Sequence, residues 1–194
     1  MLEIRHLEKI VDGRSMLSID ELKVEAGEVV AVIGPVGAGK TLLISILAGA
    51  LPRSGGSVSF AGKELSACAQ RPGVLLAEDL LYERLSVEQN LAFYAQVYGV
   101  TAARVSEMLA QVGLSDQVQQ TVSKLTPSAL RRLAFARALL PRPRLLLLDQ
   151  PTLRSDLETQ ELMARLLRQT AREGAAILLT DEDLAWAGAC CTCA

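Results

Sequence analysis

Residues 34–41 combine three glycines with a lysine and a threonine, in the order Gly34-Pro35-Val36-Gly37-Ala38-Gly39-Lys40-Thr41. Glycines at this spacing let successive backbone N–H groups turn inward and surround an anion at the start of a helix. The ammonium group of Lys40 can then reach the β- and γ-phosphates of a nucleotide, and the Thr41 hydroxyl can ligate Mg²⁺. The segment is therefore predicted to be a phosphate-binding P-loop, and we count the next residue, Leu42, among its nucleotide-binding residues.

A second group with metal chemistry is Asp149, which directly follows the apolar run 145–148. In a P-loop fold, a carboxylate at the end of such a strand holds Mg²⁺, directly or through water. The alternative role is a cap on a turn or a helix. Because a P-loop is also present, we favour the metal role and group Asp149 with Thr41 as candidate Mg²⁺ ligands.

The elements around the glycine-rich loop match what it requires. Residues 29–33 form an uninterrupted apolar run, typical of a buried parallel strand. Residues 41–49 have the length of a helix and end at a glycine. A glycine-rich turn that binds nothing is the alternative, but the order strand, loop, helix is the context that favours phosphate binding.

The rest of the chain also alternates between strand and helix patterns. We predict a hairpin in residues 1–30, a helical stretch over 86–113, a helix over 128–140 capped by Thr126 and Pro127, strands at 145–148 and 175–179, and a helix over 158–170. Strands that alternate with helices favour a mostly parallel sheet. The predicted fold class is therefore α/β, of the P-loop NTPase type.

Composition limits the possible functions of this 194-residue chain. Half of the residues are hydrophobic and 22% are charged, which is typical of a globular domain, and the formal net charge is −2. Because a nucleic-acid binder usually has a basic excess, we expect no direct binding to nucleic acid. No apolar run approaches the roughly 18–20 residues that span a bilayer, so a cytoplasmic domain is predicted.

Three of the four cysteines, Cys190, Cys191 and Cys193, lie within the last five residues, and the fourth is Cys68. Such a cluster could hold a metal ion, but no histidine lies nearby and a fourth ligand is not evident. The favoured alternative is reduced thiols that pack as small apolar side chains or lie in a frayed end.

Several segments together resemble the ATP-binding subunit of an ATP-binding cassette (ABC) transporter. They are residues 26–30, the P-loop, and residues 85–91, 132–139 and 145–152. The resemblance implies a single domain over 1–194, with an N-terminal antiparallel β lobe, a parallel core sheet and a helical lobe at about 80–140. It implies ATP and Mg²⁺ as cofactors and another ABC domain as a partner in a homo- or heterodimer. Since family members continue past this region with another strand and a helix, we expect the chain to be truncated at its C-terminus.

Two positions that the family uses for catalysis are changed here. The resemblance places a glutamate, the general base, after Asp149, where this chain has Gln150, and a switch histidine where it has Glu182. An amide can orient a water molecule but cannot take its proton. A carboxylate near a γ-phosphate repels it, although residues 181–183 are also compatible with a solvated acidic turn.

Other family positions are changed as well. The aromatic residue that stacks on adenine corresponds to Val11, and the signature loop corresponds to Thr126-Pro127-Ser128. Pro127 lacks an N–H, and Ser128 adds a side chain where close approach to a phosphate needs glycine. The segment that contacts transmembrane permease subunits begins with Gln or Glu in the family and corresponds to Glu78, which we count as a third candidate Mg²⁺ ligand.

These features predict a domain that binds Mg·ATP with weak or absent hydrolysis and sits peripherally at the inner face of the membrane beside permease subunits. The alternative is a regulatory or sensor module that keeps the ABC fold, fused to a DNA-binding or other effector domain.

Overall fold

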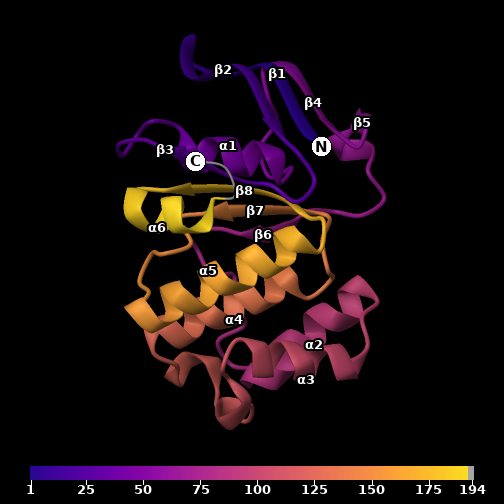
Figure 1. Ribbon diagram of the computed structural model, residues 1–194, viewed down its shortest axis with the longest axis vertical. Helices are drawn as coiled ribbons and strands as arrows, with labels where there is room; N and C mark the ends of the chain where they lie inside the picture. Colours follow the sequence, from indigo (N-terminus) through magenta and orange to yellow (C-terminus); the bar gives the residue numbers. More distant parts are fainter. Residues whose placement is uncertain (192–194) are drawn as a thin grey trace.

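The computed structural model describes residues 1–191 and contains two β-sheets with helices between and beside them (Figure 1). The first sheet is antiparallel, with the strand order β2-β1-β4-β5. Its strands are β1 (Leu2–Val11), β2 (Arg14–Val24), β4 (Gly55–Phe60) and β5 (Lys63–Glu64). The turn at Asp12 and Gly13 joins β1 to β2, so the predicted N-terminal hairpin is confirmed.

The second sheet is parallel, with the strand order β3-β8-β7-β6. Its strands are β3 (Val29–Ile33), β6 (Gly73–Leu75), β7 (Leu145–Asp149) and β8 (Ala176–Asp181). The leucines of β7 alternate between two cores: Leu145 and Leu147 pack on one face of the sheet, and Leu146 and Leu148 on the other. Burial on both faces explains why this strand is apolar throughout.

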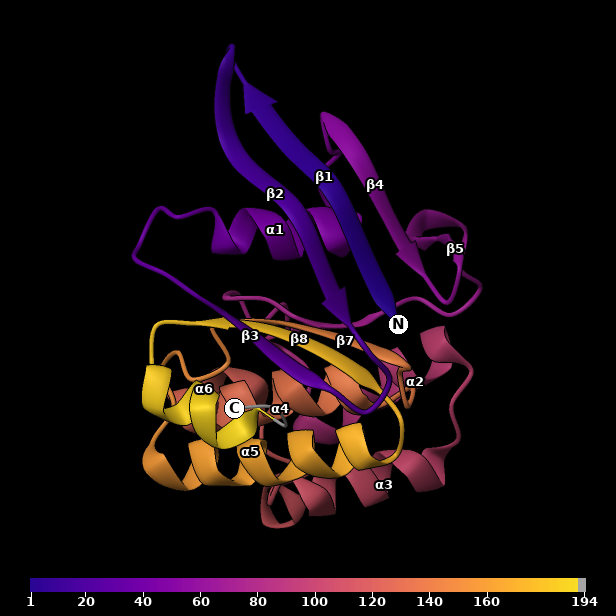
Figure 2. The same cartoon turned by 45° about the horizontal axis from the view of Figure 1, so that its top comes forward.

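Helices cover both faces of the parallel sheet (Figures 1 and 2). Helix α1 (Lys40–Leu47) lies between the two sheets and shares a core with both. The opposite face is covered by α4 (Pro127–Leu139), α5 (Leu157–Arg172) and α6 (Leu184–Cys190). This arrangement confirms the predicted α/β, P-loop NTPase fold class.

The predicted helical stretch 86–113 is two helices, α2 (Val87–Tyr98) and α3 (Ala102–Gln111). Gly99 ends α2 with a φ of 68°, a conformation that glycine adopts without steric cost. Ser86 and Gln89 form a capping box at the start of α2. Short 3₁₀ turns follow α3 at Ser115–Gln117 and Val122–Lys124, and another one lies at Leu65–Ala67.

The end of the described chain is more ordered than the sequence suggested. Asp183 caps α6 by accepting a hydrogen bond from the backbone N–H of Trp186 at 3.0 Å. Cys190 is fully buried in the core, and burial raises the pKa of its thiol to about 12. Cys193 lies outside the described residues, and within residues 1–191 no group of three potential metal ligands is close enough to hold a metal ion. No helix of this part is long and apolar enough to cross a membrane.

Candidate nucleotide-binding site

The predicted P-loop connects the end of β3 to the start of α1, at the carboxyl end of the parallel sheet. Gly37 and Gly39 have φ values of 84° and 87°, which side chains other than glycine rarely tolerate. A Cβ atom at Gly39 would lie 3.1 Å from the carbonyl oxygen of Met16, so this loop packs closely against strand β2. Residues 35–38 are exposed, and Val36 is 83% exposed. The loop therefore forms an open rim at the start of α1.

Lys40 lies inside this rim, with only 6% of its surface exposed. Its Nζ donates hydrogen bonds to the carbonyl oxygens of Gly34 at 2.6 Å and Pro35 at 2.8 Å. The same ammonium group forms an ion pair with Oε1 of Glu182 at 3.5 Å. Thr41 is exposed on the first turn of the same helix, and Leu42 is half-buried behind it.

Asp149 ends β7 and is fully buried. Its Oδ1 accepts a hydrogen bond from the Thr180 hydroxyl at 2.7 Å, whereas Oδ2 has no hydrogen-bond partner among residues 1–191. An unpartnered buried carboxylate oxygen is costly, because its desolvation is not compensated. A hard cation such as Mg²⁺ would compensate it, and Mg²⁺ is commonly held by one or two carboxylates together with substrate phosphates. The donor set therefore fits this metal.

Gln150 and Glu182 come from the ends of neighbouring strands and meet. The Gln150 Nε2 donates a hydrogen bond to the Glu182 Oε1 at 3.4 Å. Gln150 has a φ of 46°, and its backbone N–H donates to the Thr180 carbonyl at 2.8 Å. The structure thus brings Lys40 and Gln150 together at the Glu182 carboxylate.

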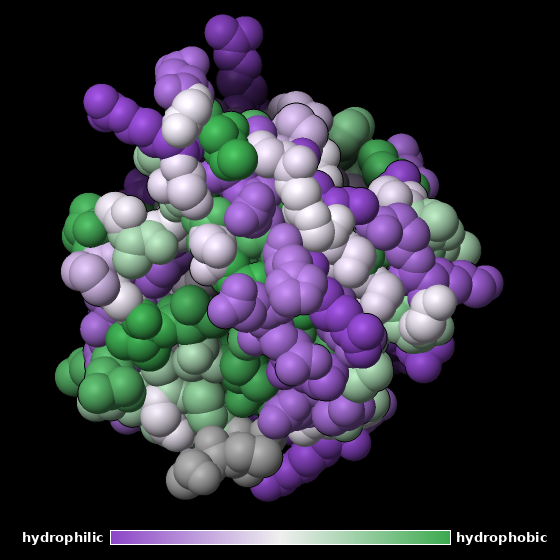
Figure 3. All heavy atoms as spheres, turned by 90° about the horizontal axis from the view of Figure 1, so that it is seen from above, coloured by the Kyte–Doolittle hydropathy of each residue, from purple (hydrophilic) through white to green (hydrophobic). Residues whose placement is uncertain are grey.

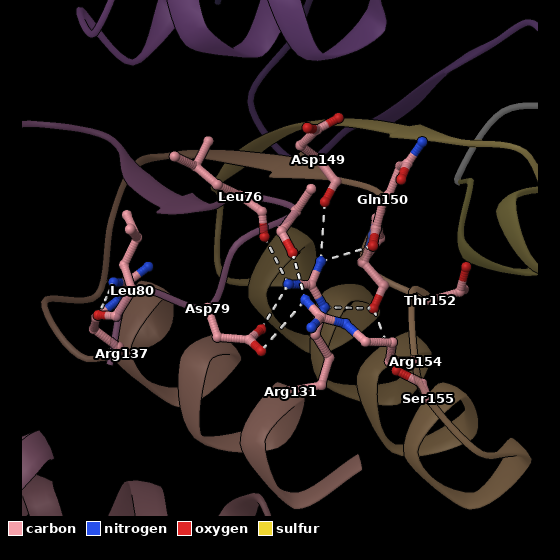
Figure 4. Close-up of polar contacts among 12 residues, drawn as sticks. Leu76, Asp79, Leu80, Arg131, Arg137, Asp149, Gln150, Thr152, Arg154 and Ser155 are labelled. Carbon is pink, nitrogen blue, oxygen red and sulfur yellow. Dashed lines mark hydrogen bonds and ion pairs between the residues drawn. The ribbon is translucent and has the colours of Figure 1, made fainter. Parts of the chain in front are cut away.

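A buried arginine that sequence analysis did not identify organises this edge of the sheet. Arg131 on α4 has no exposed surface. Its guanidinium donates to Asp79 Oδ1 and to the carbonyl oxygens of Leu76, Asp149, Gln150 and Pro151, at 2.6–3.1 Å (Figure 4). Burial lowers the pKa of Arg131, and the Asp79 carboxylate opposes that change. The side chains of Asp149 and Gln150 both point away from Arg131, so the arginine holds only their backbone (Figure 4).

Asp181 plays a similar part at the end of β8, and this excludes a wholly solvated turn at residues 181–183. Its carboxylate is almost fully buried and accepts hydrogen bonds from the Thr152 hydroxyl at 2.9 Å. It also accepts from the backbone N–H groups of Glu182 at 2.7 Å and Asp183 at 3.0 Å. The sequence could have indicated this role, because Asp181, like Asp149, comes at the end of an apolar strand pattern.

Two other predicted positions lie around this centre with no hydrogen bond or ion pair to it among residues 1–191. Val11 is 45% exposed on the hairpin whose Met16 touches the P-loop, and the view onto this lobe shows hydrophobic side chains among polar ones (Figure 3). Glu78 is exposed at the bend after β6, next to the Asp79 that pairs with Arg131. No hydrogen bond or ion pair within residues 1–191 links Glu78 to Thr41 or Asp149.

The signature positions begin α4, as predicted. The Thr126 hydroxyl accepts a hydrogen bond from the Ala129 backbone N–H at 3.3 Å, and Pro127 is the first helical residue. Ser128 Oγ accepts a hydrogen bond from the Asp156 backbone N–H at 3.1 Å. The Ser128 hydroxyl is therefore engaged by the segment before α5.

Comparison with known proteins agrees with this geometry. A family model described as "ABC transporter" matches residues 17–153. The taurine import ATP-binding proteins TauB of Escherichia coli (strain K12) and Shigella flexneri are each 34% identical over 189 residues, which cover 95% of this chain and 74% of theirs. The chain belongs to the ABC transporter family, as an ATP-binding domain.

Solved structures give the same result. The chain is similar to an ATP-binding subunit of an ABC transporter, with a TM-score of 0.88 and 25% identity, over 98% of this chain and 82% of that one. It is also similar to a putative ABC transporter ATP-binding protein from Pyrococcus furiosus, with a TM-score of 0.84 and 25% identity, over 95% and 92% of the two chains.

Proposed function

We propose that this domain binds Mg·ATP, turns it over slowly or not at all, and works as one half of a pair of ABC domains in an importer. The observation that carries the proposal is the meeting of an intact phosphate-binding loop with Gln150 at the position of the general base. The loop offers backbone N–H groups, and Lys40 offers charge. The unpartnered Oδ2 of Asp149 offers a place for the metal.

Nucleotide binding can persist without hydrolysis, because different residues carry out the two steps. Thr41 and Asp149 would hold Mg²⁺, with Glu78 as a third candidate, and the ion would offset phosphate charge when bound. Gln150 can hydrogen-bond a water molecule, but an amide does not accept its proton at neutral pH. General-base catalysis contributes about 10²–10⁴-fold, so its loss alone would make hydrolysis slow.

Pairing with another domain does not remove the defect. In the family, each site joins the P-loop and catalytic residues of one subunit to the signature of the other. A homodimer would carry Gln150, Glu182 and the changed signature in both sites. With an intact partner, one site would lack the base and the other would receive Pro127 and Ser128.

For transmembrane partners, an exposed aromatic cluster next to Glu78 supports docking of permease subunits. Tyr82 lies 4.9 Å from Phe93 and 6.0 Å from Tyr94, measured between ring centroids. Tyr82 and Phe93 are 47% and 40% exposed. Exposed, clustered aromatic rings favour a protein interface. The relatives named for taurine import support an importer, which would place this domain at the inner face of the membrane.

The test is calorimetric titration with Mg²⁺ and a non-hydrolysable ATP analogue, followed by measurement of phosphate release from ATP. Wild type should bind, and Lys40→Ala should weaken binding by about 100-fold or more, because a desolvated charge contact to phosphate is lost. Lys63→Ala, an exposed lysine on β5, is the matched control and should bind like wild type. Absence of binding by wild type, or phosphate release as fast as in ordinary transport ATPases, would contradict the proposal.

A further inference from the structure

The ammonium group of Lys40 is held by oxygen atoms of this chain. A lysine ammonium has three N–H donors. Here it donates two hydrogen bonds, to the carbonyl oxygens of Gly34 and Pro35 at 2.6 and 2.8 Å, and it forms an ion pair with the Glu182 carboxylate at 3.5 Å. A phosphate that binds Lys40 therefore competes with these oxygens for the ammonium group. The Glu182 side chain is 47% exposed, so it is the acceptor that can move most easily.

Glu182 also lies at the end of the site where the terminal phosphate of a nucleotide is expected. Its Oε1 contacts Lys40, which marks the β- and γ-phosphates, and Gln150, which follows the candidate metal ligand Asp149. The backbone of Glu182 is fixed, because its N–H donates to the buried carboxylate of Asp181 at 2.7 Å. The carboxylate can swing, but its Cα cannot retreat from this position without breaking that hydrogen bond.

The nearby carboxylates have other partners. The Asp181 carboxylate accepts hydrogen bonds from the Thr152 hydroxyl and from two backbone N–H groups. Asp149 has one oxygen bound to Thr180 and the other free for a metal ion. Glu182 is thus the carboxylate that competes with phosphate for Lys40.

We propose that Glu182 makes this site prefer nucleoside diphosphates to nucleoside triphosphates. The inference rests on the proposed nucleotide binding. A triphosphate adds negative charge at the end where Glu182 lies, so it loses affinity both by repulsion and by breaking the ion pair with Lys40. A diphosphate lacks the terminal phosphate, so the repulsion by Glu182 and the cost of breaking its ion pair with Lys40 are both smaller. Because Glu182 is half exposed, solvent and salt reduce the repulsion, and we expect about a tenfold preference.

The experiment compares the dissociation constants of Mg·ADP and of the magnesium complex of a β,γ-imido ATP analogue, by calorimetry at fixed salt. Wild type should bind the diphosphate about tenfold more tightly. Glu182→Gln keeps the size and hydrogen-bonding capacity of the side chain but removes its charge. It should strengthen triphosphate binding about tenfold and change diphosphate binding much less. Glu173→Gln removes the same charge away from the site, because Glu173 caps the end of α5 just before β8 begins, whereas Glu182 follows the end of β8; this variant should keep the wild-type ratio.

The outcomes separate this inference from the function on which it rests. An unchanged ratio in Glu182→Gln, with both nucleotides bound, would overturn the role of Glu182 and leave nucleotide binding intact. Weaker triphosphate binding in Glu182→Gln would overturn it as well, since the carboxylate would then be helping to hold the metal complex. No binding of either nucleotide by wild type would overturn nucleotide binding itself and this preference with it.

Discussion

The P-loop and the ends of β7 and β8 form two edges of the candidate site, and they differ in the residues that they present to a nucleotide. Residues 34–41 keep the residue types that bind phosphate, in an exposed loop shaped by glycines. The strand ends hold buried hydrogen-bond networks around Arg131 and Asp181, and they carry Gln150 and Glu182 at the positions that we propose face the reaction. If the proposed function is right, this comparison indicates that the backbone frame of such a site can be present without its catalytic side chains.

Arg131 gives the largest expected effect, because it tests whether the frame is needed for stability. In Arg131→Leu, four carbonyl oxygens lose their donor and Asp79 loses its buried partner. We expect a loss of about 3–5 kcal/mol in the free energy of unfolding, measured by urea denaturation. Arg154→Ala is the control: it removes an exposed arginine that contacts the same Asp79 at 3.7 Å and should cost less than about 1 kcal/mol. Equal costs would show that the frame at this edge is not held by the buried arginine.

A double substitution at Gln150 and Glu182 tests whether these two positions affect hydrolysis together. Gln150→Glu alone would place a second carboxylate beside Glu182, where the two would repel each other and the phosphate, so we expect little gain in phosphate release. Gln150→Glu combined with Glu182→His restores the base without that repulsion and should raise the rate by about tenfold to 100-fold, within the range for general-base catalysis. If the single variant gains as much as the double one, the two positions are independent.

Gly73 on β6 tests how tightly α4 packs against the frame. A Cβ atom there would lie 2.2 Å from the Ala138 carbonyl oxygen and 2.7 Å from Pro143 Cγ. Gly73→Ala should therefore destabilise the domain by about 1–3 kcal/mol, seen as a lower Tm. Gly188→Ala, in α6, is the control: a Cβ atom there meets nothing within 4 Å among residues 1–191, so the change should be neutral or slightly stabilising. A small effect at Gly73 would mean that β6 moves readily against α4.

The fold was largely predictable because its signals are local. Residues 29–33 and 145–148 are apolar runs, and Thr126 with Pro127 marks the start of a helix, so the local sequence indicates where these elements begin. Strand β6 escaped prediction because three residues carry too little pattern. Helix α6 was missed because its cap, Asp183, lies in an acidic run that also fits a solvated turn.

The site was predictable only where a motif or the family resemblance marked it. Residues 34–41 and Asp149 come at the ends of apolar strand patterns, so the sequence places them at the carboxyl edge of the parallel sheet. The role of Arg131 depends on carbonyl oxygens from segments up to 55 residues away in the sequence, and no local pattern encodes such contacts. The contact of Glu182 with Lys40 likewise depends on β8 lying beside β3 in the sheet.

Asp156 gives the smallest expected effect; it links the start of α4, where the signature loop is predicted, to α5. Its carboxylate accepts the Thr159 backbone N–H at 2.8 Å and caps the helix, and its own N–H donates to Ser128. Loss of this cap in Asp156→Ala should cost about 1 kcal/mol at neutral pH, measured by urea denaturation. The hydrogen bond that Asp156 accepts from Thr159 lowers the pKa of Asp156. The contribution of its charge is therefore complete above the ordinary aspartate pKa of about 4 and is lost as the pH falls through the lower, folded-state value. Asp156→Asn keeps an acceptor without the charge, so the stability gap between it and wild type should shrink at acidic pH; a gap that does not depend on pH would show that the charge adds nothing to the cap.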